Sequence, residues 1–161
     1  MNSRRRGFTL IELLVVIAII GVLSAVVLAS LNTARSKGDD AAIKSDLSTI
    51  QVQSELYYDG HGSSYGSAFV AAAIASEPYA ANGTNLFSAD KTINSALNSA
   101  ISLSGQNGVI AVGPGGQSWA VGVNLKSDSS QVWCVDYTGG SAIEPNSLNI
   151  GGGTNVAKCP P

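Results

Sequence analysis

The feature that most constrains this chain is a run of 24 residues near its N-terminus, residues 8–31, in which Glu12 carries the only charge. As an α-helix such a run would be about 36 Å long, which is enough to cross a hydrocarbon core of about 30 Å. Residues 8–31 are therefore predicted to form a transmembrane helix.

Charged residues are placed unevenly around this run. Three arginines at positions 4–6 precede it, and after Glu12 the next charged residue is Arg35. Because basic residues next to a membrane helix stay on the cytoplasmic side, the N-terminus is expected in the cytoplasm and the remainder outside. The sequence thus predicts a single-pass protein of the inner (cytoplasmic) membrane.

Three interpretations of the run compete. It could be a secretory signal peptide cut after Ala29, since Val27-Leu28-Ala29 is an acceptable cleavage site, or it could be a plain membrane anchor. Neither explains Glu12, because an acidic side chain in a membrane helix costs a few kcal/mol and usually has a function. A tolerated glutamate near the membrane boundary is the alternative for that residue.

The third interpretation depends on the residues around Glu12. The segments RGFTLIELL, from Arg6, and AIIGVL, from Ala18, resemble the class III signal peptide of type IV pilins and pseudopilins. The resemblance implies that a prepilin peptidase removes residues 1–7 by cutting after Gly7 and then methylates the new N-terminus, Phe8. The mature protein would keep its membrane helix, unlike an ordinary secreted protein.

The resemblance also implies a role for Glu12, which is expected to pair with the free amino group of Phe8 of a neighbouring subunit. A carboxylate and an ammonium are each costly in an apolar bundle, and pairing them recovers much of that cost while fixing the register between subunits. Many pilins have a helix-kinking proline where this chain has Ala29, so a smoother helix is expected here, with Gly21 as its weak point.

Beyond the membrane run, residues 32–58 are predicted to continue the same helix. Apolar and small side chains recur there at helical spacing, so that one face could pack on a globular domain. They are Ile43, Leu47, Ile50, Ser54 and Tyr57. Glycines in the segment Asp59-Gly60-His61-Gly62 end the helix, and residues 59–161 would form a pilin-like head.

The head is predicted to contain a short helix and an antiparallel sheet. Ser88 is the expected N-cap of a helix that carries Ile93, Leu97 and Ile101 on one side. Residues 109–112, 118–125 and 131–137 have the composition of strands, with a hairpin turn at residues 126–130. The apolar face expected to cover the helix consists of Trp119, Trp133, Val135 and Tyr137. The predicted fold class is α+β, with a long N-terminal helix packed against a small antiparallel sheet.

The two cysteines, Cys134 and Cys159, form an even pair in a domain predicted to face an oxidising space, so we expect a disulfide. It would pin residues 139–157, which are rich in Gly, Ser and Asn and should fray without it. Type IV pilins have a comparable C-terminal loop closed by a disulfide, although a generic staple of a secreted protein would look the same in the sequence.

Catalytic, metal and nucleic-acid functions have little support in the sequence. His61 is the only histidine and lies in a glycine-rich turn, where a solvated histidine is expected rather than a hydrolase triad. Asp39, Asp40 and Asp128 make no EF-hand pattern, so no metal site is predicted. Without residues 1–7 the chain has six basic and eleven acidic residues, which disfavours direct binding of DNA.

We therefore interpret the chain as a structural filament subunit, not an enzyme, that uses no cofactor. The resemblance implies as partners identical or related pilins, a prepilin peptidase, an assembly ATPase and a platform membrane protein, and an extracellular pilus as the final location. A pseudopilin of a type II secretion system is the alternative, and a secreted binding domain or an anchored hydrolase using His61 are further hypotheses.

Overall fold

The computed structural model describes residues 7–67, 69–74, 83–145 and 157–159. The chain divides into two compact units, Met1–Arg35 and Ser36–Pro161. Helix α1, Leu10–Gly60, supplies residues to both units and is uninterrupted, as expected from the absence of a kinking proline at Ala29.

The first unit contains the part of α1 that is predicted from the sequence to span a membrane. Its apolar side chains are exposed throughout, among them Leu10, Leu14, Ile20 and Leu31. Helix α1 is also long and apolar enough at this end to cross a membrane. Because water does not tolerate so many exposed aliphatic side chains on one helix, this part of α1 requires a lipid or protein environment.

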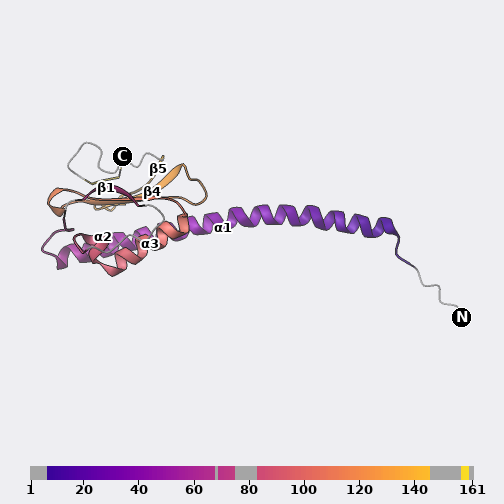
Figure 1. Ribbon diagram of the computed structural model, residues 1–161, viewed down its shortest axis with the longest axis horizontal. Helices are drawn as coiled ribbons and strands as arrows, with labels where there is room; N and C mark the ends of the chain where they lie inside the picture. The colour runs from indigo at the N-terminus through magenta and orange to yellow at the C-terminus, as the bar shows by residue number, and fades with distance from the viewer. Residues whose placement is uncertain (1–6, 68, 75–82, 146–156, 160–161) are drawn as a thin grey trace. The chain divides into compact units, whose positions relative to one another are not determined.

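The second unit contains a five-stranded antiparallel sheet in the order β1-β2-β3-β4-β5, in which each strand pairs with the next in sequence. Figure 1 marks the position of β1, β4 and β5 in this sheet. The strands are β1 (Phe69–Ile74), β2 (Gly108–Val112), β3 (Trp119–Asn124), β4 (Gln131–Asp136) and β5 (Ser141–Pro145). The helices besides α1 are α2 (Leu86–Ala89), α3 (Lys91–Ser104) and the short 3₁₀ helix η1 (Pro114–Gly116).

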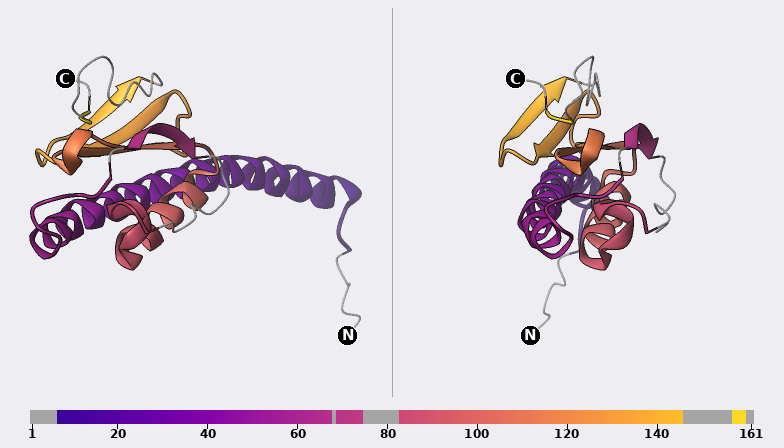
Figure 2. Two further views of the ribbon diagram at one scale, coloured as in Figure 1. Left: turned by 60° about the vertical axis from the view of Figure 1, so that its left-hand side comes forward. Right: turned by 90° about the vertical axis from the view of Figure 1, so that its left-hand side faces the viewer.

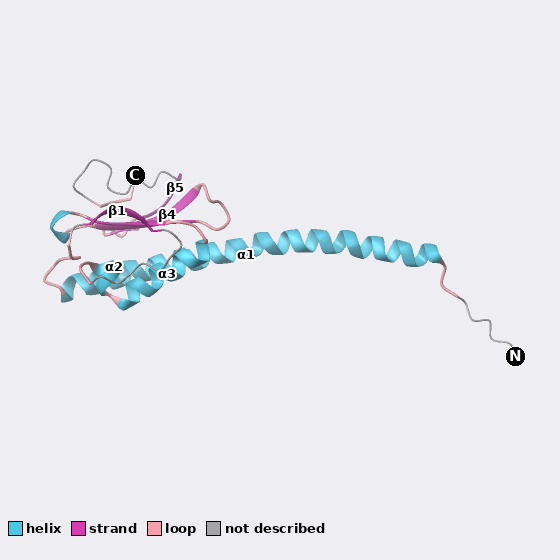
Figure 3. Cartoon of the chain, viewed as in Figure 1, coloured by secondary structure: helices cyan, strands magenta, loops and turns pink. Residues whose placement is uncertain are grey.

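One face of the sheet packs on helices. Figure 2 shows α1, α2 and α3 on the same side of the strands. The core between them is formed by Ile43, Leu47 and Ile50 of α1, by Ile93, Leu97 and Ile101 of α3, and by Trp119, Val121, Val123 and Val135 of the sheet. The predicted α+β fold, a long N-terminal helix packed against a small antiparallel sheet, is therefore confirmed (Figure 3).

The opposite face of the sheet carries a second, smaller apolar cluster. Its members are Val109, Ala111, Ala120, Cys134, Ala157 and Cys159. The alternation of side chains along a strand explains the two clusters, since Val121 and Val123 point to the helices while Ala120 points away. Residues 157–159 thus return from the chain end to cover the outer face.

The structure corrects the predicted N-cap of the short helix. Ser88 lies inside α2, where it forms a capping box with Asn85, and α3 is instead capped by Asp90. The Asp90 carboxylate accepts the backbone N–H groups of Thr92 and Ile93 at 2.8 and 2.9 Å. A carboxylate at this position satisfies two N–H groups that have no partner within the helix.

The sheet is also larger than predicted. The three predicted strands are β2, β3 and β4, and their hairpin turn at residues 126–130 is present. Two edge strands were missed: β1 lies in the stretch left unassigned, and β5 in the tail predicted to have little structure of its own. The rest of that tail, residues 146–156, lies outside the described residues.

Candidate functional site

The predicted cleavage position lies in an exposed segment just before α1. Gly7 and Phe8 precede α1 and have no helical or strand structure, and the side chain of Phe8 is 86% exposed. A Cβ atom added at Gly7 would meet no atom within 4 Å. The backbone at this junction is accessible to an enzyme, whereas the three arginines at positions 4–6 lie outside the described residues.

Thr9 and Glu12 form a reciprocal capping box at the start of α1. The N–H of Thr9 and its hydroxyl each donate to Glu12 Oε2 at 2.8 Å. In return the N–H of Glu12 donates to Thr9 Oγ1 at 3.3 Å. This pattern, Thr at the N-cap and Glu three residues later, satisfies N–H groups that the helix cannot pair itself.

The capping box leaves one oxygen of Glu12 unused. Both bonds from Thr9 go to Oε2, so Oε1 accepts no hydrogen bond from the described residues. A negative charge in the first turn of a helix is also favoured by the helix dipole. Glu12 is therefore held at a fixed orientation by its own helix while it keeps an acceptor for an external donor.

The surroundings of Glu12 are apolar. Leu10, Ile11, Leu13 and Val16 flank it along α1, and all four side chains are exposed. In a lipid or protein environment that covers these residues, an unpaired carboxylate would be costly. This arrangement favours the binding of a cation at Glu12 once the apolar surface is covered.

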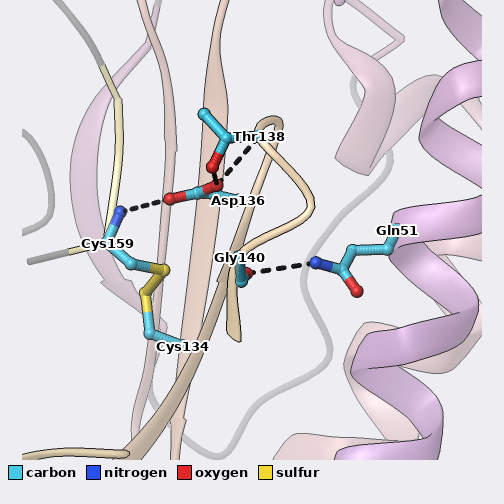
Figure 4. Close-up of a disulfide and its surroundings, with 6 residues drawn as sticks. All are labelled: Gln51, Cys134, Asp136, Thr138, Gly140 and Cys159. Carbon is cyan, nitrogen blue, oxygen red and sulfur yellow. Dashed lines mark hydrogen bonds between the residues drawn. A yellow bond between two sulfur atoms is a disulfide. The ribbon is translucent and has the colours of Figure 1, made fainter. Parts of the chain in front are cut away.

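The predicted disulfide is present at the other end of the chain, where Cys134 of β4 is joined to Cys159 (Figure 4). Both cysteines are buried in the smaller apolar cluster, on the face of the sheet opposite the helices. Asp136, two residues after Cys134, accepts the N–H of Cys159 at 3.0 Å. Asp136, the last residue of β4, could not be identified from the sequence, because nothing local distinguishes it from the other aspartates.

His61 is exposed at the end of α1. Its ring stacks on Tyr57, with 3.8 Å between centroids, and its Nδ1 lies 2.8 Å from the Tyr57 carbonyl oxygen. Within the described part of the chain, neither Asp59 nor Ser63 hydrogen-bonds with the imidazole. The described residues also contain no group of three or more His, Cys, Asp or Glu suited to a metal ion.

Residues 2–28 match the family model of the prokaryotic N-terminal methylation motif. The N-terminus of this chain is therefore similar to a methylation motif. The predicted resemblance to type IV pilins and pseudopilins is thus confirmed for this segment, and the matched residues include Gly7, Phe8 and Glu12. Thr9 belongs to the same motif, and its role was missed although the spacing Thr-x-x-Glu is a recognisable capping signal.

Similarity to known proteins extends a short way beyond the methylation motif. The chain is 40% identical to type II secretion system core protein G of Dickeya chrysanthemi over 57 residues, 35% of this chain and 37% of that protein. It is 44% identical to the type IV wide pilus major component PilA4 of Thermus thermophilus over 52 residues, 32% and 40% of the two chains. It is 42% identical to the type IV major pilin protein PilE1 of Neisseria gonorrhoeae over 64 residues, 38% of each.

These similarities cover less than half of the relatives. The chain spans 37 to 40% of the length of the three proteins named above. No solved structure matches the chain significantly. Similarity therefore identifies the N-terminal segment, while the sheet and its disulfide are described by the structure alone.

Proposed function

We propose that this protein is a structural subunit of a type IV pilus-like filament rather than an enzyme. It would be inserted in the inner membrane with its N-terminus in the cytoplasm, processed by a prepilin peptidase after Gly7, and methylated at Phe8. An assembly ATPase and a platform membrane protein would then polymerise it with identical or related subunits. The observation that carries this proposal is Glu12 itself: it lies in an exposed apolar helix within the segment that matches the methylation motif, and only one of its two carboxylate oxygens accepts the hydrogen bonds from Thr9.

Glu12 supports the proposal because its oxygen Oε1 could accept a hydrogen bond from the amino group that cleavage would create. Cutting after Gly7 would place a positively charged amine on Phe8, and the amine of a neighbouring subunit could reach Oε1 while Thr9 holds Oε2. A charge pair in an apolar bundle is stable only when both partners are present. Removal of residues 1–7 would therefore be required before the subunits can assemble.

A pseudopilin of a type II secretion system is the second candidate. Two of the similar proteins are core protein G of such systems, from Dickeya chrysanthemi and Klebsiella pneumoniae. Pilus subunits and pseudopilins would share the same processing and the same Glu12 chemistry. They differ in the length of the filament and in what depends on it, so imaging of surface filaments and an assay of exported enzymes separate them.

Mass spectrometry of the mature N-terminus tests the processing. A mature chain that begins with N-methylated Phe8 is expected. A chain that begins at Ser30 would instead identify an ordinary secretory signal cut after Ala29 and would overturn the proposal. A Gly7→Val variant should accumulate unprocessed, whereas Gly38→Ala, a glycine with no atom within 4 Å of an added Cβ, should be processed normally.

Electron microscopy of cells that produce Glu12 variants tests the charge pairing. Glu12→Ala and Glu12→Lys should be cleaved after Gly7 but should yield few or no filaments. Asp59→Ala, which removes an exposed carboxylate at the far end of the same helix, is the matched control and should assemble normally. Filaments of normal number and geometry from Glu12→Ala would refute the pairing while leaving the processing result unaffected.

A further inference from the structure

The C-terminal residues 157–159 are attached to the sheet by side chains rather than by a strand ladder. The N–H of Ala157 donates to Ser118 Oγ, and the N–H of Cys159 donates to Asp136 Oδ2, both at 3.0 Å. Ala157 and Cys159 are buried, while Lys158 between them is exposed. This alternation is that of an extended segment that presents every second residue to the sheet.

The Asp136 carboxylate is oriented without help from residues 157–159. Its other oxygen, Oδ1, accepts the N–H of Thr138 at 2.8 Å and the Thr138 hydroxyl at 2.5 Å. Both donors lie two residues further along the same hairpin, so this turn fixes the carboxylate locally. Oδ2 is thereby left pointing at Cys159, as Figure 4 shows.

The backbone of Ser118, the residue that supplies the second acceptor, is fixed by the sheet. The Ser118 carbonyl accepts the N–H of Gly113 at 2.8 Å, which closes the turn between β2 and β3. Between the two acceptors, the outer face offers small and β-branched side chains, Val109, Ala111 and Ala120. The result is a surface of small and β-branched side chains, and Ala157 and Cys159 belong to the same buried cluster.

Burial makes occupation of this surface favourable. Asp136 is only 2% exposed, and without the Cys159 N–H its Oδ2 would have no donor among the described residues. In the docked state the Cys159 N–H replaces the water that would otherwise solvate Oδ2, and a hydrogen bond to a charged acceptor is net favourable, so the carboxylate itself favours docking of residues 157–159. This contribution exists whether or not the cysteines are cross-linked.

The same hydrogen bond aligns the cysteines. Cys134 and Asp136 are two residues apart on β4 and point to the same face. When the N–H of Cys159 reaches Asp136, its side chain is brought next to Cys134, and the Cα atoms lie 5.9 Å apart in the structure. Docking at Asp136 therefore places the two sulfur atoms within bonding reach.

We propose that the outer face of the sheet is a preformed docking surface for an extended chain end, and that Asp136 is the positioning residue that docks residues 157–159 before the disulfide forms. One cysteine thiolate attacks an external disulfide and releases one thiol. The second thiolate then attacks the mixed disulfide and releases the other thiol, so that the external disulfide takes up both electrons. This inference does not rest on the proposed filament function.

Hydrogen exchange of the full-length protein in detergent micelles tests docking without the cross-link. In a Cys134→Ser, Cys159→Ser variant, the amides of residues 157 and 159 should remain protected. Adding Asp136→Asn should speed their exchange about tenfold or more, as expected for loss of a hydrogen bond to a charged group. Exchange at the unprotected rate in the cysteine-free protein would overturn the proposal.

Asp128→Asn is the matched control, because Asp128 makes the same pair of bonds to Ser130 in the neighbouring turn but does not contact the tail. It should leave the exchange of the tail unchanged, and equal effects of both substitutions would overturn the proposal. Ser118→Ala removes the second anchor without touching the turn after β4, and it should also speed exchange at residue 157. The near-ultraviolet circular dichroism of buried Trp119 reports whether each variant is folded.

The rate of reoxidation gives a second readout. After reduction, the wild-type protein mixed with oxidised glutathione should form the Cys134–Cys159 disulfide about tenfold faster than Asp136→Asn. Asp128→Asn should match the wild type. Equal rates for wild type and Asp136→Asn would show that the disulfide forms without prior docking and would refute the role of Asp136.

Discussion

The carboxylate of Asp40 on α1 accepts the backbone N–H of Lys126, 86 residues later in the chain, at 2.6 Å. The same carboxylate accepts the N–H of Ser127 at 3.2 Å and the Ser127 hydroxyl. The ammonium group of Lys126 in turn donates to the Ser104 carbonyl at the end of α3, at 3.2 Å. One turn between β3 and β4 thus connects the sheet to both helices.

Replacing Asp40 should therefore loosen the sheet from α1. Asp40→Ala leaves three donors of the turn without their acceptor, and a loss of about 1–3 kcal/mol in the free energy of unfolding is expected. Denaturant titration followed by tryptophan fluorescence measures it. Asp39→Ala is the control, because the neighbouring carboxylate makes no hydrogen bond with any of the described residues, and it should cost less than about 0.5 kcal/mol.

Gly116 should tolerate no side chain. Its φ is +67°, and an added Cβ would lie 2.2 Å from Ser64 Oγ and 2.5 Å from the Gly66 carbonyl oxygen. Gly116→Ala should cost about 2–4 kcal/mol from steric overlap and backbone strain together. Gly139→Ala has a similar φ of +79° but open space, so it should cost only about 1 kcal/mol. Equal losses in thermal unfolding would contradict the steric argument.

Tyr65 should make the fold sensitive to alkali. Burial, followed by the nearby Glu55 carboxylate that accepts its hydroxyl, raises the pKa of Tyr65 to about 12. Above pH 10 the unfolded chain loses this proton while the folded chain keeps it, so stability should fall between about pH 10 and pH 12 and be unaffected below. Ultraviolet titration of the phenolates measures the pKa, and Tyr65→Phe should remove the late transition.

The N-cap of α3 can be identified by mutation. Asp90→Ala should destabilise the head by about 1 kcal/mol and speed the exchange of the Thr92 and Ile93 amides. Ser88→Ala should instead affect the start of α2, where Ser88 hydrogen-bonds with Asn85. If Ser88→Ala were the substitution that exposed the amides of α3, the assignment of the cap would be wrong.

The parts of this protein that follow from the sequence alone are those with a local signal. Residues 8–31 are mostly apolar and carry no charge except at Glu12, and the positions of Ile43, Leu47 and Ile50 repeat at helical spacing. Strands β2, β3 and β4 are rich in β-branched and aromatic residues. Each of these patterns predicts the secondary structure of its segment and the face that the segment buries.

Tertiary structure decided what depends on a distant partner. The alanine-rich strand β1 and the short strand β5 have weak strand propensity and form because β2 and β4 offer them an edge. Asp40, Asp90 and Asp136 look alike in the sequence, yet one joins helix to turn, one caps a helix and one docks the chain end. The sequence does not show which hydrogen-bond donors will surround an aspartate. The fold brings those donors together, and they determine the role of each carboxylate.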